Sequence, residues 1–129
     1  MTNSEVQRWL DDYVAAWRSY DPDDIRELFS ERADYRYHPW DEPLSGRDAI
    51  VSDWLDSPDA SGTYDAHYSP YVVDGDRAVA VGTSRYTNPD GSLRTIYHNV
   101  FLLRFDDDGL CRSFTEVFME LPERLRSEA

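Results

Sequence analysis

The chain has 129 residues, of which 26 are acidic and 13 are basic, so its formal net charge at pH 7 is -13. Nucleic acids and anionic membranes attract basic surfaces, so this charge excludes both as partners. A hydrophobic content of 40% and an aromatic content of 14% are typical of a globular protein. We therefore expect one domain spanning residues 1–129, which is long enough to bury a core.

The cysteine content and the hydropathy of the chain indicate the cellular compartment in which the protein is expected. The single cysteine, Cys111, excludes an internal disulfide, and its place in a strand pattern predicts a small core residue. There is no run of about 18 apolar residues that could cross a bilayer, and no N-terminal apolar run resembles a signal peptide. We expect a cytoplasmic protein.

The first predicted elements are two helices. Ser4-Glu5-Val6-Gln7 has the pattern of a capping box, which predicts a helix over about Ser4–Tyr20. Apolar residues follow at i, i+3, i+4 and i+7 spacing and define one buried stripe: Val6, Trp9, Leu10, Tyr13, Val14 and Trp17. Asp21 suits an N-cap and Pro22 a first helical position, so a second, short helix is predicted over Pro22–Phe29.

The middle of the chain alternates between strand and helix. A short strand is predicted over Ala33–His38, and the prolines that follow predict a loop ending at Pro43. A third helix is predicted over Arg47–Leu55. A further strand is predicted over Thr63–Val73, with an interruption at Pro70.

The last third of the chain has the pattern of three consecutive antiparallel strands, Arg77–Asn88, Leu93–Phe105 and Leu110–Glu120. Both connections contain Asp-Gly, the strongest short hairpin signal, because glycine adopts the positive φ that such turns require. Helices come first and strands later, an order typical of an α+β fold. We predict N-terminal helices packed in the concave face of a strongly bent antiparallel sheet, which is a cone or half-barrel.

These strands place a defined set of side chains on one face. If each hairpin closes about its Asp-Gly, three cross-strand pairs result: Phe101 with Phe114, Asn99 with Glu116, and Tyr97 with Phe118. Side chains alternate between faces with period two, so all six point the same way. The neighbouring strand adds small residues to this face: Ala78, Ala80, Gly82 and Ser84. The pattern predicts the lining of a cavity, with aromatic side chains around two polar groups.

Glu116 is the most informative acid in this predicted lining. A carboxylate between aromatic residues is costly without a partner, and desolvation raises its pKa, which makes it a candidate acid or base. Asn99, predicted directly opposite, would supply a hydrogen bond. The structural alternatives are a buried pair of Glu116 with Asn99 or with a tyrosine that specifies packing, and an edge position that reaches water.

The opposite face of the three strands is also partly apolar. Its apolar residues are Val79, Val81, Val100, Leu102, Val117 and Met119. Polar residues such as Arg85 and His98 are interspersed among them. This mixture suits a partner subunit better than water, so we expect a homodimer through the outer sheet face.

The order of elements resembles the nuclear transport factor 2-like superfamily, the cone-shaped α+β fold shared with SnoaL-like proteins. The matching segments are Tyr13-Val14-Ala15-Ala16-Trp17, Asp21, Leu28-Phe29, Ser45-Gly46-Arg47, Ala49-Ile50, Arg104-Phe105 and Asp108-Gly109. The superfamily includes ketosteroid isomerases, epoxide hydrolases, polyketide cyclases, dehydratases and non-enzymatic modules. The resemblance therefore implies the fold more closely than the function.

Ketosteroid isomerases allow a comparison residue by residue. Tyr13, within Tyr-Val-Ala-Ala on the first helix, is similar to their oxyanion-binding tyrosine. His38 precedes Pro39 where those enzymes carry an Asp-Pro with the general base, and Phe101 falls where they carry a protonated acid. The resemblance implies Tyr13 as a hydrogen-bond donor and His38 as a candidate base. A core tyrosine and a loop histidine bonded to backbone are the structural alternatives.

Together the patterns predict a domain that binds a small apolar ligand, without a cofactor and without a metal. The candidate catalytic residues are His38, Glu116 and Tyr13, and an enzyme would use acid–base chemistry of the isomerase, cyclase or dehydratase type. The candidate ligand-binding residues are Trp17, Tyr35, Trp40, Trp54, Tyr97, Asn99, Phe101, Phe114 and Phe118. The competing interpretation is a non-catalytic dimeric interaction or carrier module whose cone is filled by its own side chains.

Overall fold

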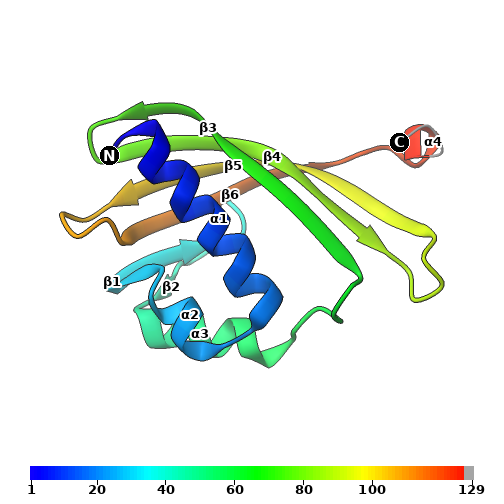
Figure 1. Ribbon diagram of the computed structural model, residues 1–129, viewed down its shortest axis with the longest axis horizontal. Helices are drawn as coiled ribbons and strands as arrows, with labels where there is room; N and C mark the ends of the chain where they lie inside the picture. The colour runs from blue at the N-terminus through cyan, green and yellow to red at the C-terminus, as the bar shows by residue number, and fades with distance from the viewer. Residues whose placement is uncertain (127–129) are drawn as a thin grey trace.

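The computed structural model describes residues 1–126, which form helices packed against a sheet (Figure 1). In chain order the elements are α1 (Asn3–Ser19), α2 (Pro22–Arg26), β1 (Phe29–Arg36), β2 (Leu44–Ser45), α3 (Arg47–Asp56), β3 (Tyr64–Asp74), β4 (Arg77–Thr87), β5 (Leu93–Phe105), β6 (Cys111–Glu120) and α4 (Glu123–Arg126). The predicted order of helix, helix, strand, helix and four strands is confirmed. The short strand β2 and the short helix α4 are additional.

The strands form one open sheet in the order β2-β1-β6-β5-β4-β3. Neighbouring strands run antiparallel, except that β1 pairs with β6 in parallel. In Figure 1, α1 crosses one face of this sheet, where it packs against β3, and α3 packs against β1 and β2. The predicted α+β class, with N-terminal helices against a bent sheet, is confirmed.

The start of α1 differs from the predicted capping box. Thr2 is the N-cap: its Oγ1 accepts the Glu5 N–H at 3.1 Å, and Oε1 of Glu5 accepts the Thr2 N–H at 3.0 Å. A carboxylate at this position also suits the positive end of the helix dipole, which favours this box over the predicted one at Ser4. The helix ends at Ser19, and Tyr20 is its C-cap: the Tyr20 N–H makes the last helical bond, to the Ala16 carbonyl, and its left-handed backbone (φ 49°) turns the chain away.

The boundary between α2 and β1 also differs from the prediction. β1 begins at Phe29, so the helix is shorter than predicted and the strand starts earlier than Ala33. The reason lies in tertiary packing: the Leu28 carbonyl accepts the Cys111 N–H at 2.9 Å and the Trp9 indole N–H at 3.0 Å. These contacts, and the complete burial of Phe29, override the local helical pattern.

The predicted register between β5 and β6 is wrong by two residues. The observed pairs are Phe101 with Glu116, Asn99 with Phe118, and Tyr97 with Glu120. Two local features add together. The turn is one residue longer than predicted, as the hydrogen bond from the Asp106 N–H to the Leu110 carbonyl (2.8 Å) shows. A bulge at the start of β6 shifts the register by one further residue. A shift of two residues keeps every side chain on its face, so the predicted face is preserved.

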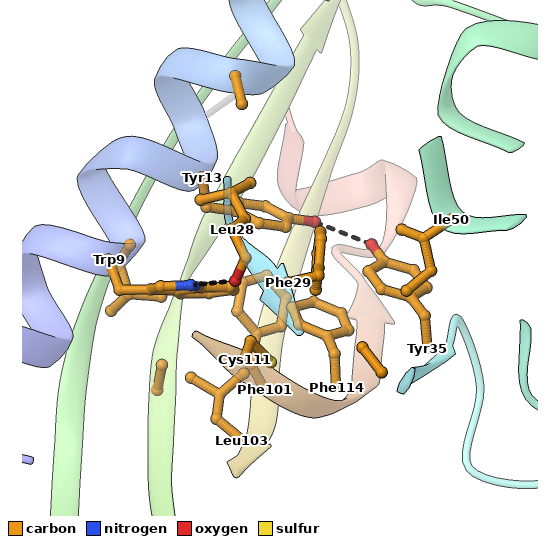
Figure 2. Packing of buried hydrophobic residues seen from close by; sticks show 14 of the residues in the cluster. Trp9, Tyr13, Leu28, Phe29, Tyr35, Ile50, Phe101, Leu103, Cys111 and Phe114 are labelled. Atoms are coloured by element: carbon orange, nitrogen blue, oxygen red, sulfur yellow. Dashed lines mark hydrogen bonds between the residues drawn. The ribbon is translucent and has the colours of Figure 1, made fainter. Parts of the chain in front are cut away.

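The interior is filled at one end and hollow at the other. Fully buried phenylalanines, among them Phe29, Phe101 and Phe114, pack against the Trp9 and Tyr13 rings of α1 (Figure 2). The Tyr13 ring stacks on Phe114, with ring centroids 5.5 Å apart. From Tyr13 to Tyr20 the helix faces a cavity instead. Cys111 lies in the filled part and is buried, as predicted.

Candidate ligand-binding cavity

A cavity of about 400 Å³ lies between the C-terminal half of α1, α3 and the inner face of the sheet. This volume is within the range of small-molecule sites in proteins. Most of the lining is aromatic, and the rest is polar or acidic: Tyr13, Trp17, Tyr20, Tyr35, Tyr37, Asp53, Trp54, Asp56, Ser57, Asp59, Tyr68, Ser84, Tyr86, Tyr97, Asn99, Glu116 and Phe118. Such a lining can hold a molecule with an apolar body and a few polar groups.

A close approach of two strands positions the Tyr68 side chain in this lining. Tyr68 on β3 lies directly opposite Gly82 on β4. A Cβ at Gly82 would lie 2.5 Å from Cδ1 of the Tyr68 ring and 2.0 Å from the His67 carbonyl oxygen. Only glycine therefore fits at this position, and its missing side chain leaves room for the ring.

A buried hydrogen-bond chain runs from Tyr68 across the sheet to Asn99. The Ser84 hydroxyl donates to Asn99 Oδ1 at 2.8 Å, and its oxygen lies 2.6 Å from the Tyr68 hydroxyl. Ser84 has one proton to donate, so Tyr68 is the donor in the second bond. Asn99 is only 5% exposed. Its Oδ1 is occupied, and its Nδ2 has no hydrogen-bond partner within residues 1–126, which leaves an amide donor for a ligand.

Two tyrosine hydroxyls meet at the boundary between the core and the cavity. The hydroxyl of Tyr13 lies 3.1 Å from that of Tyr35, as Figure 2 shows. Burial raises the pKa of both phenols well above the ordinary value, so both are protonated at working pH. The pair shares one hydrogen bond, and the accepting hydroxyl keeps its own proton free. One phenolic donor therefore remains for a ligand.

Glu116 is the acid on the sheet side of the cavity. Its carboxylate has no hydrogen bond and no ion pair with any side chain in residues 1–126, and Asn99, its predicted partner, bonds to Ser84 instead. Burial raises the pKa of Glu116 to about 7, while the charge of His38 acts in the opposite direction. At neutral pH this carboxyl group can therefore both give and take a proton.

Three aspartates, here called the acidic rim, lie where the cavity meets solvent: Asp53, Asp56 and Asp59. The Tyr37 hydroxyl donates to Oδ2 of Asp53 at 2.6 Å. The Trp17 indole N–H donates to Oδ2 of Asp59 at 3.0 Å, and the Asp59 N–H donates to the Tyr20 hydroxyl at 2.8 Å. The two bonds of Asp59 fix the loop after α3 against the end of α1, and the Tyr37 bond holds Asp53 of α3 against the end of β1.

His38, the predicted base, lies just after β1 and is not part of the cavity lining. Its Nδ1 is 2.8 Å from Oδ2 of Asp41. Its ring stacks on Trp40, with centroids 5.1 Å apart, and also packs against Phe118 at 5.4 Å. Trp40 is 81% exposed and does not belong to the lining either. His38 thus contacts Phe118, which belongs to the lining, but does not itself belong to it.

The structure brings together eight of the predicted site residues around the cavity: Tyr13, Trp17, Tyr35, Trp54, Tyr97, Asn99, Glu116 and Phe118. Four others are placed elsewhere. His38 and Trp40 lie in the loop after β1, and Phe101 and Phe114 are buried in the filled part of the core. Phe101 and Phe114 do share the sheet face of Glu116, but the ring of Tyr13 covers them.

Sequence reasoning missed several lining residues, chiefly Tyr20, Tyr37, Tyr68, Tyr86 and the acidic rim. Tyr86 had a usable signal, because it continues the period-two series that runs through Gly82 and Ser84. Tyr68 had the same signal within its own strand. Asp53 lies within α3, Asp56 ends it and Asp59 follows it, and no local pattern distinguishes them from ordinary surface acids.

The open, bent sheet, the crossing helix and the cavity between them define an α+β cone. Residues 10–114 match the SnoaL-like domain family, and this chain therefore belongs to that family. The resemblance to the nuclear transport factor 2-like superfamily is confirmed. No curated protein matches the sequence.

Two solved structures show the same fold. An NTF-2 like protein of unknown function from Burkholderia xenovorans LB400 is 14% identical with a TM-score of 0.67, covering 98% of this chain and 94% of its own. An ntf2-like protein of unknown function from Burkholderia pseudomallei K96243 is 17% identical with a TM-score of 0.66, covering 92% of each chain. At these identities the likeness concerns the fold alone.

The outer sheet face exposes large apolar side chains, including Leu102, Val117 and, at 76% exposure, Met119. These residues lie on the adjacent strands β5 and β6, as predicted. The homodimer through this face stays a prediction. Among the described residues, no helix is long and apolar enough to cross a membrane.

Proposed function

We propose that this protein binds a small, largely apolar molecule in the cavity and acts on it by acid–base chemistry through Glu116, without a cofactor. The observation that carries the proposal is a carboxyl group without a protein partner, set among aromatic rings in a cavity of about 400 Å³. Burying such a group costs stability, and costs of this kind cluster at sites of binding and catalysis.

Glu116 is the proposed acid and base. The donors on the same lining are the free proton of the Tyr13–Tyr35 pair and Nδ2 of Asn99. They suit a ligand carbonyl oxygen, which gains negative charge when Glu116 takes a proton from the adjacent carbon. The C–H electron pair then forms a C=C bond while the carbonyl π pair moves onto the oxygen, which gives an enolate. When the carbonyl re-forms, Glu116 returns the proton to another carbon or to a departing hydroxyl group, which leaves as water. Isomerisation, cyclisation and dehydration all fit this scheme.

His38 takes a different role from the one expected. Outside the lining, and bonded to Asp41, it does not reach the space that a ligand would fill. Its charge lowers the pKa of Glu116 and so favours the ionised, proton-accepting form of that group. We therefore assign His38 to tuning Glu116 and not to proton abstraction.

The competing interpretation is a non-catalytic module whose cone is filled. Its support is the densely packed end of the interior around Phe101 and Phe114. The hollow end, with its unpartnered Glu116 and Asn99 donors and acceptors, favours ligand binding instead.

A thermal-shift panel of aromatic ketones with one or two rings tests this function. A ligand at 100 times its Kd stabilises the fold by about 2.7 kcal/mol, which a melting curve resolves. Solvent deuterium exchange at the carbon next to the carbonyl, followed by NMR, then reports proton abstraction. We expect Glu116→Gln to abolish exchange while binding persists, and Glu31→Gln, at an exposed position on β1, to change neither. The proposal fails if no ketone stabilises the protein, or if exchange is the same in both variants.

We also propose that a second copy of this chain covers the outer sheet face. The exposed Leu102, Val117 and Met119 form an apolar strip on adjacent strands, where a partner would remove them from water. Sedimentation equilibrium should give twice the 15.0 kDa mass of one chain. Leu102→Glu should give the monomer, whereas Leu55→Glu, at an exposed site on α3, should not. A monomer in the unmodified protein would refute this proposal.

A further inference from the structure

The charge in the cavity lining has one sign. Glu116 and the three aspartates of the acidic rim contribute four carboxyl groups, and no lysine, arginine or histidine belongs to the lining. The ion pairs found within residues 1–126 all involve other acids. A cavity with walls of low dielectric constant and charges of one sign repels anions and concentrates cations.

The partners of the rim acids are neutral. Asp53 accepts from the Tyr37 hydroxyl, and Asp59 accepts from the Trp17 indole. Such donors hold the carboxylates in place without cancelling their charge. Two of the rim acids are thus oriented by the protein and still lack a counter-ion.

The space between these acids is surrounded by aromatic rings. Trp17, Trp54, Tyr97 and Phe118 all belong to the lining. Tyr86 belongs to it too, but the Arg94 guanidinium already lies over that ring, 5.0 Å from its centroid. The faces of such rings carry negative potential and attract cations, and rings arranged around a space bind alkylated ammonium groups in particular. The rings also make the space apolar, so a ligand held there needs an apolar body.

A second, independent feature points to a bound ligand. Asn99 is 95% buried, its Oδ1 is taken by Ser84, and its Nδ2 is unpartnered in residues 1–126 although the residue lines the cavity. Nδ2 is not one of the enclosed polar atoms of residues 1–126, so it is open to the cavity, where a ligand acceptor can take the place of water. The ligand therefore carries a hydrogen-bond acceptor in addition to its apolar body.

We infer that the ligand of this cavity is an organic cation, an apolar molecule that carries a tertiary or quaternary ammonium group and a hydrogen-bond acceptor. This inference rests on the proposed function and names its ligand class. The ammonium group pairs with Glu116 and is drawn in by the acidic rim, while the rings of Trp17 and Trp54 contact its alkyl groups. The acceptor bonds to Asn99.

The pairing makes binding dependent on pH. The titratable groups around Glu116 are Tyr13 from α1, Tyr35, Tyr37 and His38 from β1 and its following loop, Tyr68 from β3 and Tyr86 from β4, with the acidic rim beyond. The tyrosines have raised pKa values and stay neutral. Glu116, with a pKa of about 7, ionises between pH 6 and pH 8, so affinity for a cation rises through that range.

Two probes of the same shape test the inference: benzyltrimethylammonium and its uncharged isostere neopentylbenzene, in which carbon replaces the nitrogen. Binding is followed by the indole N–H signals of Trp17 and Trp54 in ¹⁵N NMR spectra. At pH 8 we expect the ammonium probe to bind about tenfold more tightly than the isostere. At pH 6 its affinity should fall about tenfold, because the ionised fraction of Glu116 falls from about nine-tenths to about one-tenth. The affinity of the isostere should not change.

Variants separate the contributions of Glu116 and of the acidic rim to binding of the ammonium probe. Glu116→Gln should remove the pH dependence and most of the preference for the ammonium probe, the remainder coming from the acidic rim, and Asp56→Asn should weaken only the ammonium probe, by about twofold. Glu31→Gln should leave all affinities unchanged. Equal affinities for the two probes in the unmodified protein would overturn the inference and leave the proposed binding function intact. If aromatic ketones bind but neither probe does, the inference fails alone, and if nothing binds, the proposed function fails with it.

Discussion

Gly82 on β4 lies opposite Tyr68 on β3, and a Cβ at Gly82 would lie 2.0 Å from the His67 carbonyl oxygen. Gly82→Ala therefore has to push β3 away from β4, because a backbone carbonyl cannot turn aside as a flexible side chain can. We expect a loss of about 1 to 3 kcal/mol in the free energy of unfolding, measured by urea denaturation. Alanine is otherwise favoured over glycine in a strand, so an unchanged or higher stability would contradict the proposed contact.

Glu116 makes stability depend on pH. Its pKa is raised from 4.5 to about 7, so the folded protein holds a proton that the unfolded chain releases above about pH 4.5. The resulting stabilisation is complete below pH 4.5 and is lost as the pH rises through 7. Glu116→Gln cannot ionise, so at pH 8 it should be more stable than the unmodified protein by about 1 to 3 kcal/mol.

Urea denaturation at pH 4, 6 and 8 measures this effect. At pH 4 the two proteins should agree within about 0.5 kcal/mol, since Glu116 is then protonated in both states of the chain. Glu31→Gln serves as the control at an exposed site and should follow the unmodified protein at every pH. A Glu116→Gln variant no more stable than the unmodified protein at pH 8 would show that Glu116 has an ordinary environment.

The chain from Tyr68 through Ser84 to Asn99 predicts an order of stabilities. Ser84→Ala leaves both the Tyr68 hydroxyl and Asn99 Oδ1 without a partner, at a cost of about 1 to 3 kcal/mol. Tyr68→Phe removes one donor but leaves the bond from Ser84 to Asn99, so its cost should be lower, about 0.5 to 1.5 kcal/mol. Thermal or urea unfolding of both variants measures which one loses more stability. A larger loss in Tyr68→Phe than in Ser84→Ala would exclude the proposed hydrogen-bond chain.

Tyr20 fixes the loop that carries Asp59. Tyr20→Phe removes the acceptor of the Asp59 N–H, which should speed amide hydrogen exchange at Asp59 by about tenfold, the equivalent of one hydrogen bond. Tyr64→Phe is the matched control, because the Tyr64 hydroxyl donates to the Trp17 carbonyl and not to this loop. Unchanged exchange in Tyr20→Phe, or equal acceleration in both variants, would count against this role.

The sheet face of the site could be predicted because side-chain alternation has period two. Glu116, Asn99 and Ser84 all lie on the predicted face, although the register was wrong, since a shift of two residues changes partners and not faces. The partners could not be predicted, because an extra residue in the turn and a bulge in β6 leave no clear sequence signal. Asn99 consequently bonds to Ser84 and not to Glu116.

Tertiary placement accounts for the other differences. Whether a residue on the correct face lines the cavity or lies in the core depends on which part of α1 covers it: the Tyr13 ring covers Phe114 and leaves Phe118 in the lining. Likewise, His38, which the resemblance to ketosteroid isomerases implied as a candidate base, bonds to Asp41, three residues along the chain. The place of Asp59 in the acidic rim depends on how the loop after α3 meets Tyr20, which no local pattern encodes.

The central claim is that a ligand occupies the cavity beside Glu116, and the four tryptophans provide its most direct test. The measurement is a ¹⁵N NMR titration of the indole N–H signals with the aromatic ketone that stabilises the protein most. Trp17 and Trp54 line the cavity, Trp9 is in the filled core, and Trp40 is exposed outside the lining. The account predicts large shifts for Trp17 and Trp54 and none for Trp40. Shifts confined to Trp40, or no shift at Trp17 and Trp54, would contradict it.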